Sequence, residues 1–156
     1  MLVSPKKILW ATDFSPLSLK AAEYARGFRE IFGAELHVVH VLQPPLGPPV
    51  GLDIPYTTID IGLQEELIKA SKARLEALVK ESFPGDSSVK HEVVLGVPWY
   101  EICSYAQRSG VDLIIIATHG RTGLKHVLLG SVAERVVQHA GCPVLVVKSV
   151  EQDFTI

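Results

Sequence analysis

Short apolar runs alternate with amphipathic segments along the whole chain. The apolar runs predict strands at residues 7–12, 36–42, 111–118 and 143–148, and an alternating segment predicts an edge or half-buried strand at residues 89–95. Between them, apolar residues recur every three or four positions, which predicts helices over residues 16–32, 62–82, 98–109 and 131–140. Strands that alternate with helices indicate a parallel sheet with right-handed crossovers. The sequence therefore predicts an α/β fold, a doubly wound five-stranded parallel sheet with helices on both faces.

Capping and turn residues delimit the predicted elements. Ser15 and Pro16 are typical of a helix N-cap and first helical residue, and Gly33 is typical of a helix end. The first helix is expected to bury the stripe Leu17, Ala21, Tyr24, Phe28 and Ile31. Five of the ten prolines fall within residues 43–61, which predicts a proline-rich surface loop. With no internal repeat, residues 1–156 are interpreted as one domain.

Composition and charge narrow the function classes. A chain that is 47% hydrophobic cannot be mainly disordered, and a net charge of -2 argues against nucleic-acid or anionic-membrane partners. The longest apolar run, Leu113–Ala117, is far shorter than the ~18 residues of a membrane span. The two cysteines and the absence of an apolar N-terminal segment lead us to expect a cytoplasmic protein.

The ligand site of such a fold is expected where strand order reverses, beyond the carboxyl ends of the strands. If the first strand lies beside the fourth, Asp13 and the segment Ala117, Thr118 and His119 meet there. By itself, Asp13 is more typical of a solvated strand-end acid or a turn residue than of a ligand contact.

The glycine-rich segment 117–131 carries the clearest chemical signal. Its glycines allow a nest of backbone N–H groups, and the helix start at Gly130 and Ser131 favours an anion. Ser131 with Glu134 also matches a capping box, so Ser131 is alternatively predicted to cap its own helix. Together these features indicate a polyphosphate cradle; the glycines and local cations are Gly120, Gly123, Arg121, Lys125 and His126.

The residue patterns that metal sites and common catalytic motifs require are absent from the sequence. His37 and His40 point to opposite faces of a strand, and no cluster has zinc spacing, so no metal site made of protein side chains is predicted. Dinucleotide, Walker, receiver and nucleophile-elbow motifs are absent, so no catalytic residue is predicted. Cys103 and Cys142 are expected to be buried, unreactive thiols.

Several segments in order resemble the universal stress protein family, in its ATP-binding branch. The resemblance covers almost the whole chain, through residues 6–15, 40–41, 96–98, 112–123, 129–134 and 142–147. It implies a fold of the adenine nucleotide-binding type. The ATP-binding branch carries Gly-x2-Gly-x9-Gly-[Ser/Thr]. Gly120, Gly130 and Ser131 match that motif, whereas Ala117 replaces its first glycine, a change expected to weaken binding modestly.

The resemblance also implies roles for individual residues. Asp13 and Val41 would flank an adenine, Val41 through its main chain, with Thr12 lining the same pocket. The strand end would contribute Ala117 and His119. The residues expected around the phosphates are Gly120, Arg121, Gly123, Gly130, Ser131 and Val132. The implied cofactor is ATP with Mg or Mn, and the implied assembly is a homodimer formed through Val144–Val147.

Three functions are compatible with these observations. The first is a homodimeric, ATP-binding stress-response regulator without catalytic activity beyond slow ATP hydrolysis, read by a regulatory partner protein. The second is a slow ATPase or a phosphoryl- or adenylyl-transferring enzyme that uses the same pocket. The third is a dimeric scaffold in which Ala117 has closed the pocket.

Overall fold

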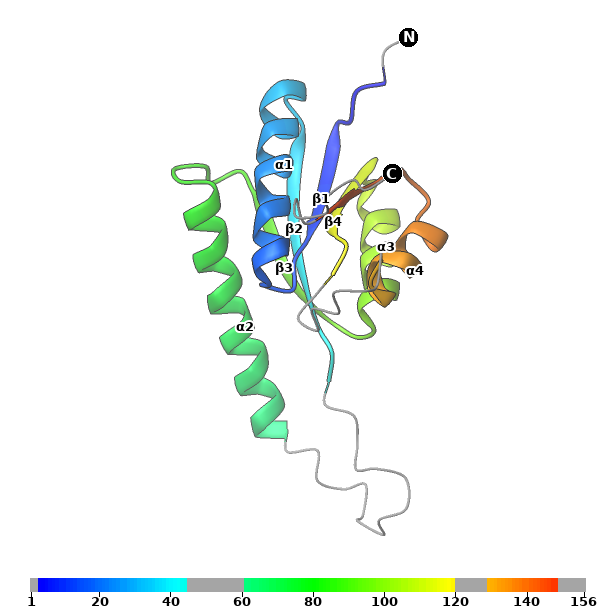
Figure 1. Ribbon diagram of the computed structural model, residues 1–156. Coiled ribbons are helices and arrows are strands. Elements are labelled where there is room, and N and C mark those ends of the chain that lie inside the picture. The colour runs from blue at the N-terminus through cyan, green and yellow to red at the C-terminus, as the bar shows by residue number, and fades with distance from the viewer. Residues whose placement is uncertain (1–2, 45–60, 120–128, 149–156) are drawn as a thin grey trace, which may run out of the picture.

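The computed structural model describes residues 3–44, 61–119 and 129–148 (Figure 1). Strands and helices alternate along the chain, as the apolar pattern predicts. The strands are β1 (Lys7–Ala11), β2 (Glu35–Leu42), β3 (Lys90–Leu95), β4 (Leu113–Ala117) and β5 (Val144–Val147). The helices are α1 (Pro16–Phe32), α2 (Ile61–Ser82), α3 (Pro98–Ser109) and α4 (Ser131–His139). In the described ranges, no helix combines the length and the apolar character needed to cross a bilayer.

The five strands form one parallel sheet in the order β3-β2-β1-β4-β5. The predicted doubly wound fold is confirmed, including the assumption that the first strand lies beside the fourth. Strand order reverses between β1 and β4, so the switch point of the fold lies at their carboxyl ends.

Two apolar clusters cover the two faces of the sheet. Side chains alternate along β1, so that Ile8 and Trp10 pack on the face of α1 and α2, while Leu9 and Ala11 pack on the face of α3 and α4. Every residue of β4 is buried, as expected for a central strand covered on both sides. The edge strand β3 is exposed or half-buried along its whole length, as its sequence pattern predicts, although burial does not alternate along it.

Helix α1 buries a different stripe from the predicted one. Its ends are as expected, since the Ser15 hydroxyl accepts a hydrogen bond from the Ser18 N–H and Gly33 adopts the left-handed conformation. However, Tyr24 is 44% and Ile31 76% exposed, so the predicted stripe is wrong at these positions. The buried side consists of small residues that let the helix approach the sheet closely: Ser18, Ala21, Ala22 and Ala25.

Helix α2 buries only its C-terminal half. Helical spacing in the sequence predicts one apolar stripe that includes Leu63, Leu67, Leu75 and Val79. Leu75 and Val79 are buried against the sheet, but Leu63 and Leu67 are 50% and 37% exposed. Figure 1 shows the reason: α2 begins beyond the carboxyl ends of the strands and runs back along the sheet. Its first turns therefore stand over the carboxyl edge instead of the core.

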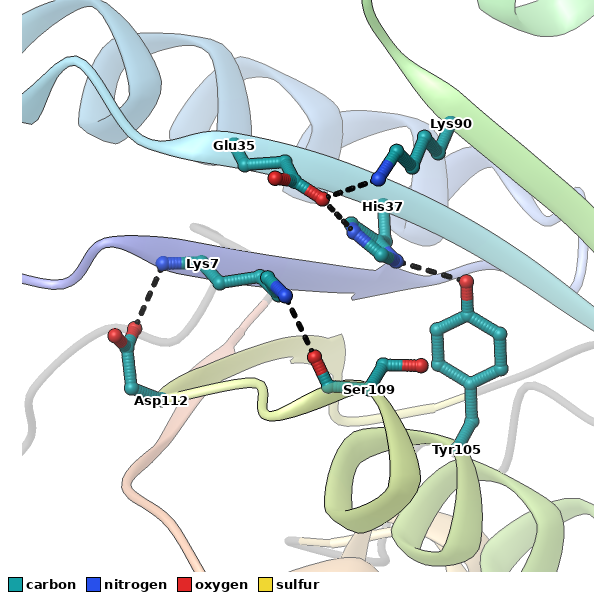
Figure 2. Close-up of polar contacts among 7 residues, drawn as sticks. All are labelled: Lys7, Glu35, His37, Lys90, Tyr105, Ser109 and Asp112. Atoms are coloured by element: carbon teal, nitrogen blue, oxygen red, sulfur yellow. Dashed lines mark hydrogen bonds and ion pairs between the residues drawn. The ribbon is translucent and has the colours of Figure 1, made fainter.

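A closed polar network occupies the opposite, amino edge of the sheet (Figure 2). The buried His37 donates from Nε2 to Glu35 Oε1 at 2.6 Å, and its Nδ1 lies 2.8 Å from the Tyr105 hydroxyl. Lys90 also donates to Glu35 Oε1, at 2.7 Å. The hydrogen bonds from Lys90 and then His37 lower the pKa of Glu35 to about 2. Nearby, Asp112 accepts the N–H of Lys7, so strands and helices are tied together here.

Candidate functional site

A cavity of about 620 Å³ opens at the carboxyl edge, where β1, β2 and β4 end. This size is within the usual range for small-molecule sites. Eight of the residues predicted for a nucleotide line it: Thr12, Asp13, Val41, Ala117, His119, Gly130, Ser131 and Val132. The other predicted residues, Gly120, Arg121 and Gly123, lie outside the described residues, as do Lys125, His126 and most of the loop 43–61.

The turn after β1 forms one wall of the cavity and is held by local hydrogen bonds. Thr12 Oγ1 accepts the Phe14 N–H at 3.1 Å and the Ser18 hydroxyl at 2.8 Å. Asp13 Oδ1 accepts the Ser15 N–H at 3.0 Å, which places the Asp13 carboxylate at the start of α1. Asp13 is therefore both a turn residue and a cavity residue, so the two alternatives drawn from the sequence coexist.

Phe14 adopts a backbone conformation that side-chain-bearing residues rarely take. Its φ is 64°, in the left-handed region, which costs roughly 1–2 kcal/mol for a residue with a Cβ. The ring packs on His40 with centroids 4.3 Å apart, and His40 Nδ1 donates to the Thr12 carbonyl at 2.9 Å. Strained conformations of this kind concentrate at functional sites, where the surrounding structure enforces them.

The main chain of Val41 faces the cavity because β2 is longer than β1. Ala11, the last residue of β1, pairs with Val39, and the Val39 carbonyl accepts the Thr12 N–H. Backbone groups alternate in direction along a strand, so Val41 points its N–H and C=O to the same side as Val39. The Leu42 carbonyl points to the other side and accepts the Gly96 N–H. Where β1 has ended, the side that Val39 and Val41 share opens into the cavity. Val41 therefore offers the cavity one N–H donor and one C=O acceptor.

The junction between β4 and α4 forms the opposite wall. The Gly130 N–H donates to the Thr118 carbonyl at 2.6 Å, and a Cβ on Gly130 would lie 2.7 Å from that carbonyl oxygen. Glycine is thus required here by the close approach of two backbone segments. The His119 ring lies beside this junction, with Nδ1 2.9 Å from Thr118 Oγ1.

The capping box predicted at Ser131 is wrong. Gly130 is the N-cap of α4 and Ser131 is its first helical residue, and no side chain in the described residues caps the helix. Ser131, Val132 and Ala133, the first three residues of α4, line the cavity. The first N–H groups of a helix have no intrahelical acceptor, and the helix dipole places partial positive charge there. The start of α4 is therefore suited to an anionic group in the cavity.

Sequence reasoning missed the residues of the third wall. Phe14 and His40 lie within recognised segments, 6–15 and 40–41, but neither was predicted to be a site residue. Helix α2 adds residues that share one helical face; helical periodicity placed Leu67 and Ala70 in the apolar stripe and gave Ser71 and Arg74 no role. The missed lining residues from α2 are Leu67, Ala70, Ser71 and Arg74.

Few charged side chains line the described cavity. Asp13 is the only carboxylate among the described lining residues, and Arg74 adds a cation on the side of α2. Over the described ranges, no group of three His, Cys, Asp or Glu residues could hold a metal ion. Cys103 and Cys142 are half-buried rather than buried as predicted, and burial raises the pKa of both thiols.

The fold is that of a doubly wound α/β protein, and its cavity lies at the switch point of the sheet. The chain belongs to the universal stress protein family, whose model matches residues 5–148. It is 38% identical over 149 residues to universal stress protein MJ0531 of Methanocaldococcus jannaschii, a match that covers 95% of this chain and 85% of that protein. The solved structure of MJ0577 from the same organism superposes with a TM-score of 0.80 at 35% identity, covering 96% of this chain and 100% of that one.

More distant structures with this fold were solved with nucleotides. One is a universal stress protein in complex with cAMP, with 21% identity, a TM-score of 0.60 and coverage of 93% of this chain and 98% of that one. Another is the universal stress protein of Archaeoglobus fulgidus in complex with dAMP, with 22% identity, a TM-score of 0.62 and coverage of 95% and 100%. At these identities, the likeness shows the fold alone.

Proposed function

We propose that this protein is an ATP-binding regulatory protein of the stress response. The observation that carries the proposal is that one cavity is lined both by Val41 and by the start of α4. Adenine offers an N6–H donor and an N1 acceptor along one edge. These groups match the acceptor and donor that the Val41 main chain presents. The start of α4 then receives the phosphates.

The bound nucleotides of fold neighbours support the adenine assignment. Proteins of this fold carry cAMP and dAMP, which share the adenine and a phosphate with ATP. In our proposal, Asp13 lies beside the nucleoside, while Gly130, Ser131 and Val132 surround the phosphates. Mg or Mn would come with ATP and be held by its phosphates, since no protein side chain is assigned to the ion.

We further propose that the protein acts by binding and not by catalysis. Phosphoryl transfer needs a positioned nucleophile and metal-holding carboxylates, and the described cavity offers Asp13 alone. The edge strand β5 is proposed to pair with a second copy through Val144–Val147. Nucleotide occupancy would then be read by a regulatory partner protein, so that the homodimer acts as a nucleotide-dependent module in the cytoplasm.

Nucleotide binding is testable by extraction of co-purified small molecules and by thermal unfolding with Mg-ATP. At a hundred times its dissociation constant, a ligand stabilises by about 2.7 kcal/mol. For a chain of this length, that raises Tm by about 5–10 °C. Absence of extracted adenine nucleotide, together with an unchanged Tm, would refute the proposal and favour a scaffold.

A matched pair of variants tests the site itself. Asp13→Ala removes a carboxylate from the cavity, whereas Asp112→Ala removes one from the amino edge, where it accepts the N–H groups of Lys6 and Lys7. We expect only Asp13→Ala to weaken Mg-ATP binding measured by calorimetry. An ATP turnover assay on the same variants tests the enzyme alternative: turnover that Asp13→Ala abolishes would contradict a purely regulatory role.

A further inference from the structure

Helix α2 supplies a wall of the cavity that neither the recognised segments nor the glycine motif includes. Its lining residues follow the spacing i, i+3, i+4 and i+7, so they form one continuous helical face: Leu67, Ala70, Ser71 and Arg74. The face is available because α2 begins beyond the carboxyl ends of the strands (Figure 1). Arg74 is the one side chain of this face that carries a charge.

Arg74 makes a cation–π contact with an aromatic ring instead of an ion pair with a carboxylate. Its guanidinium carbon lies 4.3 Å from the centroid of the Phe14 ring, which packs in turn on His40. In the described part of the chain, no carboxylate lies within ion-pair distance of Arg74. A guanidinium is planar, and the Phe14 ring lies against one side of the Arg74 guanidinium. The side chain lines the cavity, so the other face is available to a ligand.

The position of Arg74 in the fold distinguishes between the two ends of a nucleotide. Helix α2 packs on β3 and β2, and Phe14 follows Asp13 at the end of β1. The proposed phosphate site, at Gly130 and Ser131, lies beyond β4 on the other side of β1. Arg74 is therefore on the side of Val41, where the base is expected.

We propose that Arg74 stacks on the base of the bound nucleotide, forming a column of Phe14, guanidinium and heterocycle. This inference rests on the proposed nucleotide-binding function and adds a residue that determines affinity for the base. Guanidinium groups stack favourably on aromatic faces, and bases offer such a face. The left-handed backbone of Phe14 is then explained, because it positions the ring that supports Arg74.

The test compares ligands that contain the base, the phosphates or both. Calorimetry measures the binding of ATP, adenosine and inorganic tripolyphosphate to the parent protein, Arg74→Ala and Arg74→Lys. Arg74→Ala is expected to weaken ATP and adenosine about tenfold each and to leave tripolyphosphate unchanged. Arg74→Lys keeps the charge but loses the plane, so it is expected to recover less than half of the loss.

Lys72→Ala is the matched control, since Lys72 is an exposed cation on the same helix and is not among the lining residues. It is expected to leave all three affinities unchanged. Because Arg74 is exposed, the variants are expected to fold, which the Tm without ligand verifies.

Two results would overturn the stacking proposal while leaving nucleotide binding intact. In one, Arg74→Ala weakens tripolyphosphate as much as ATP and spares adenosine, which would make Arg74 a phosphate ligand. In the other, all affinities equal those of the parent. If the parent protein itself binds none of the adenine ligands, the proposed function fails, and the role of Arg74 fails with it.

Discussion

Polar groups have different roles at the amino and carboxyl edges of the sheet. At the amino edge, Glu35, His37, Lys90 and Tyr105 hydrogen-bond to one another, so their polar atoms serve the fold (Figure 2). At the carboxyl edge, the main chain of Val41 and the start of α4 face a cavity of about 620 Å³. One edge is closed by its own side chains, and the other leaves groups available to a ligand.

Strand length accounts for much of this difference. β1 and β2 begin side by side, since Lys7 pairs with Glu35, but β2 continues to Leu42 after β1 has ended opposite Val39. On the side of β1, the overhang leaves the backbone groups of Val41 without a neighbouring strand, while β3 still pairs with the other side of β2. In a doubly wound sheet, function at the carboxyl edge thus follows from where strands stop and helices begin, as much as from side-chain identity.

The largest effect is expected from a substitution that adds a side chain where the segments after β4 and before α4 make their closest contact. Gly130→Val places a Cβ 2.7 Å from the backbone oxygen of Thr118, where no flexible side chain can move away. We expect a loss of about 3 kcal/mol in the free energy of unfolding, together with loss of nucleotide binding. Urea denaturation measures the first and calorimetry the second.

Gly27→Ala is the matched control for that substitution. Gly27 lies within α1, and an added Cβ would meet no atom within 4 Å. Replacing a glycine inside a helix by alanine is expected to stabilise by about 0.5–1 kcal/mol. A Gly130→Val protein as stable as the parent would contradict the close approach of the two segments.

The histidines of β2 allow a direct comparison of the two edges. His37 and His40 are both buried, yet His37 belongs to the amino-edge network and His40 supports Phe14 beside the cavity. His37→Ala leaves the buried Tyr105 hydroxyl without this partner, which is expected to cost about 2 kcal/mol of stability. Nucleotide affinity is expected to stay at the parent value for His37→Ala and to fall for His40→Ala, as calorimetry would measure. Equal losses of affinity in both variants would remove the distinction between the edges.

Much of the fold was predictable because its signals are local. Aliphatic runs and one alternating segment located all five strands, and Ser15 and Gly33 marked helix ends that the structure confirms. The burial of individual helical residues was less predictable, because it depends on which neighbour covers each face. Tyr24 and Ile31 have the right spacing for a buried stripe, but small residues occupy the contact with the sheet.

The candidate site was predictable only where the chain itself carries the pattern. Asp13, Val41 and Gly130 lie in recognised segments, and the cavity brings all three together. Arg74 could not be found this way, since it reaches the cavity through the packing angle and overhang of α2. The prediction of a capping box at Ser131 failed although its spacing is correct. A capping Ser131 would precede the helix, but Ser131 is the first residue of α4 and Gly130 is its N-cap.

The smallest effect is expected from removing the charge of Glu35. It should change the pH dependence of stability, which the amino edge influences, but not nucleotide affinity at the carboxyl edge. Hydrogen bonds from Lys90 and His37 lower its pKa from an ordinary 4.5 to about 2 in the folded protein. A lowered pKa stabilises the fold fully above about pH 4.5, and this contribution disappears as pH falls towards 2. Glu35→Gln is therefore expected to flatten the fall in stability over that interval, without changing nucleotide affinity at pH 7. Urea unfolding at several pH values, followed by the fluorescence of the buried Trp10, measures the slope.

Glu76→Gln is the control, since Glu76 makes a single pair with the exposed Lys80, and a smaller change is expected there. Parallel stability curves for the parent and Glu35→Gln would show that the amino-edge network does not depend on this charge.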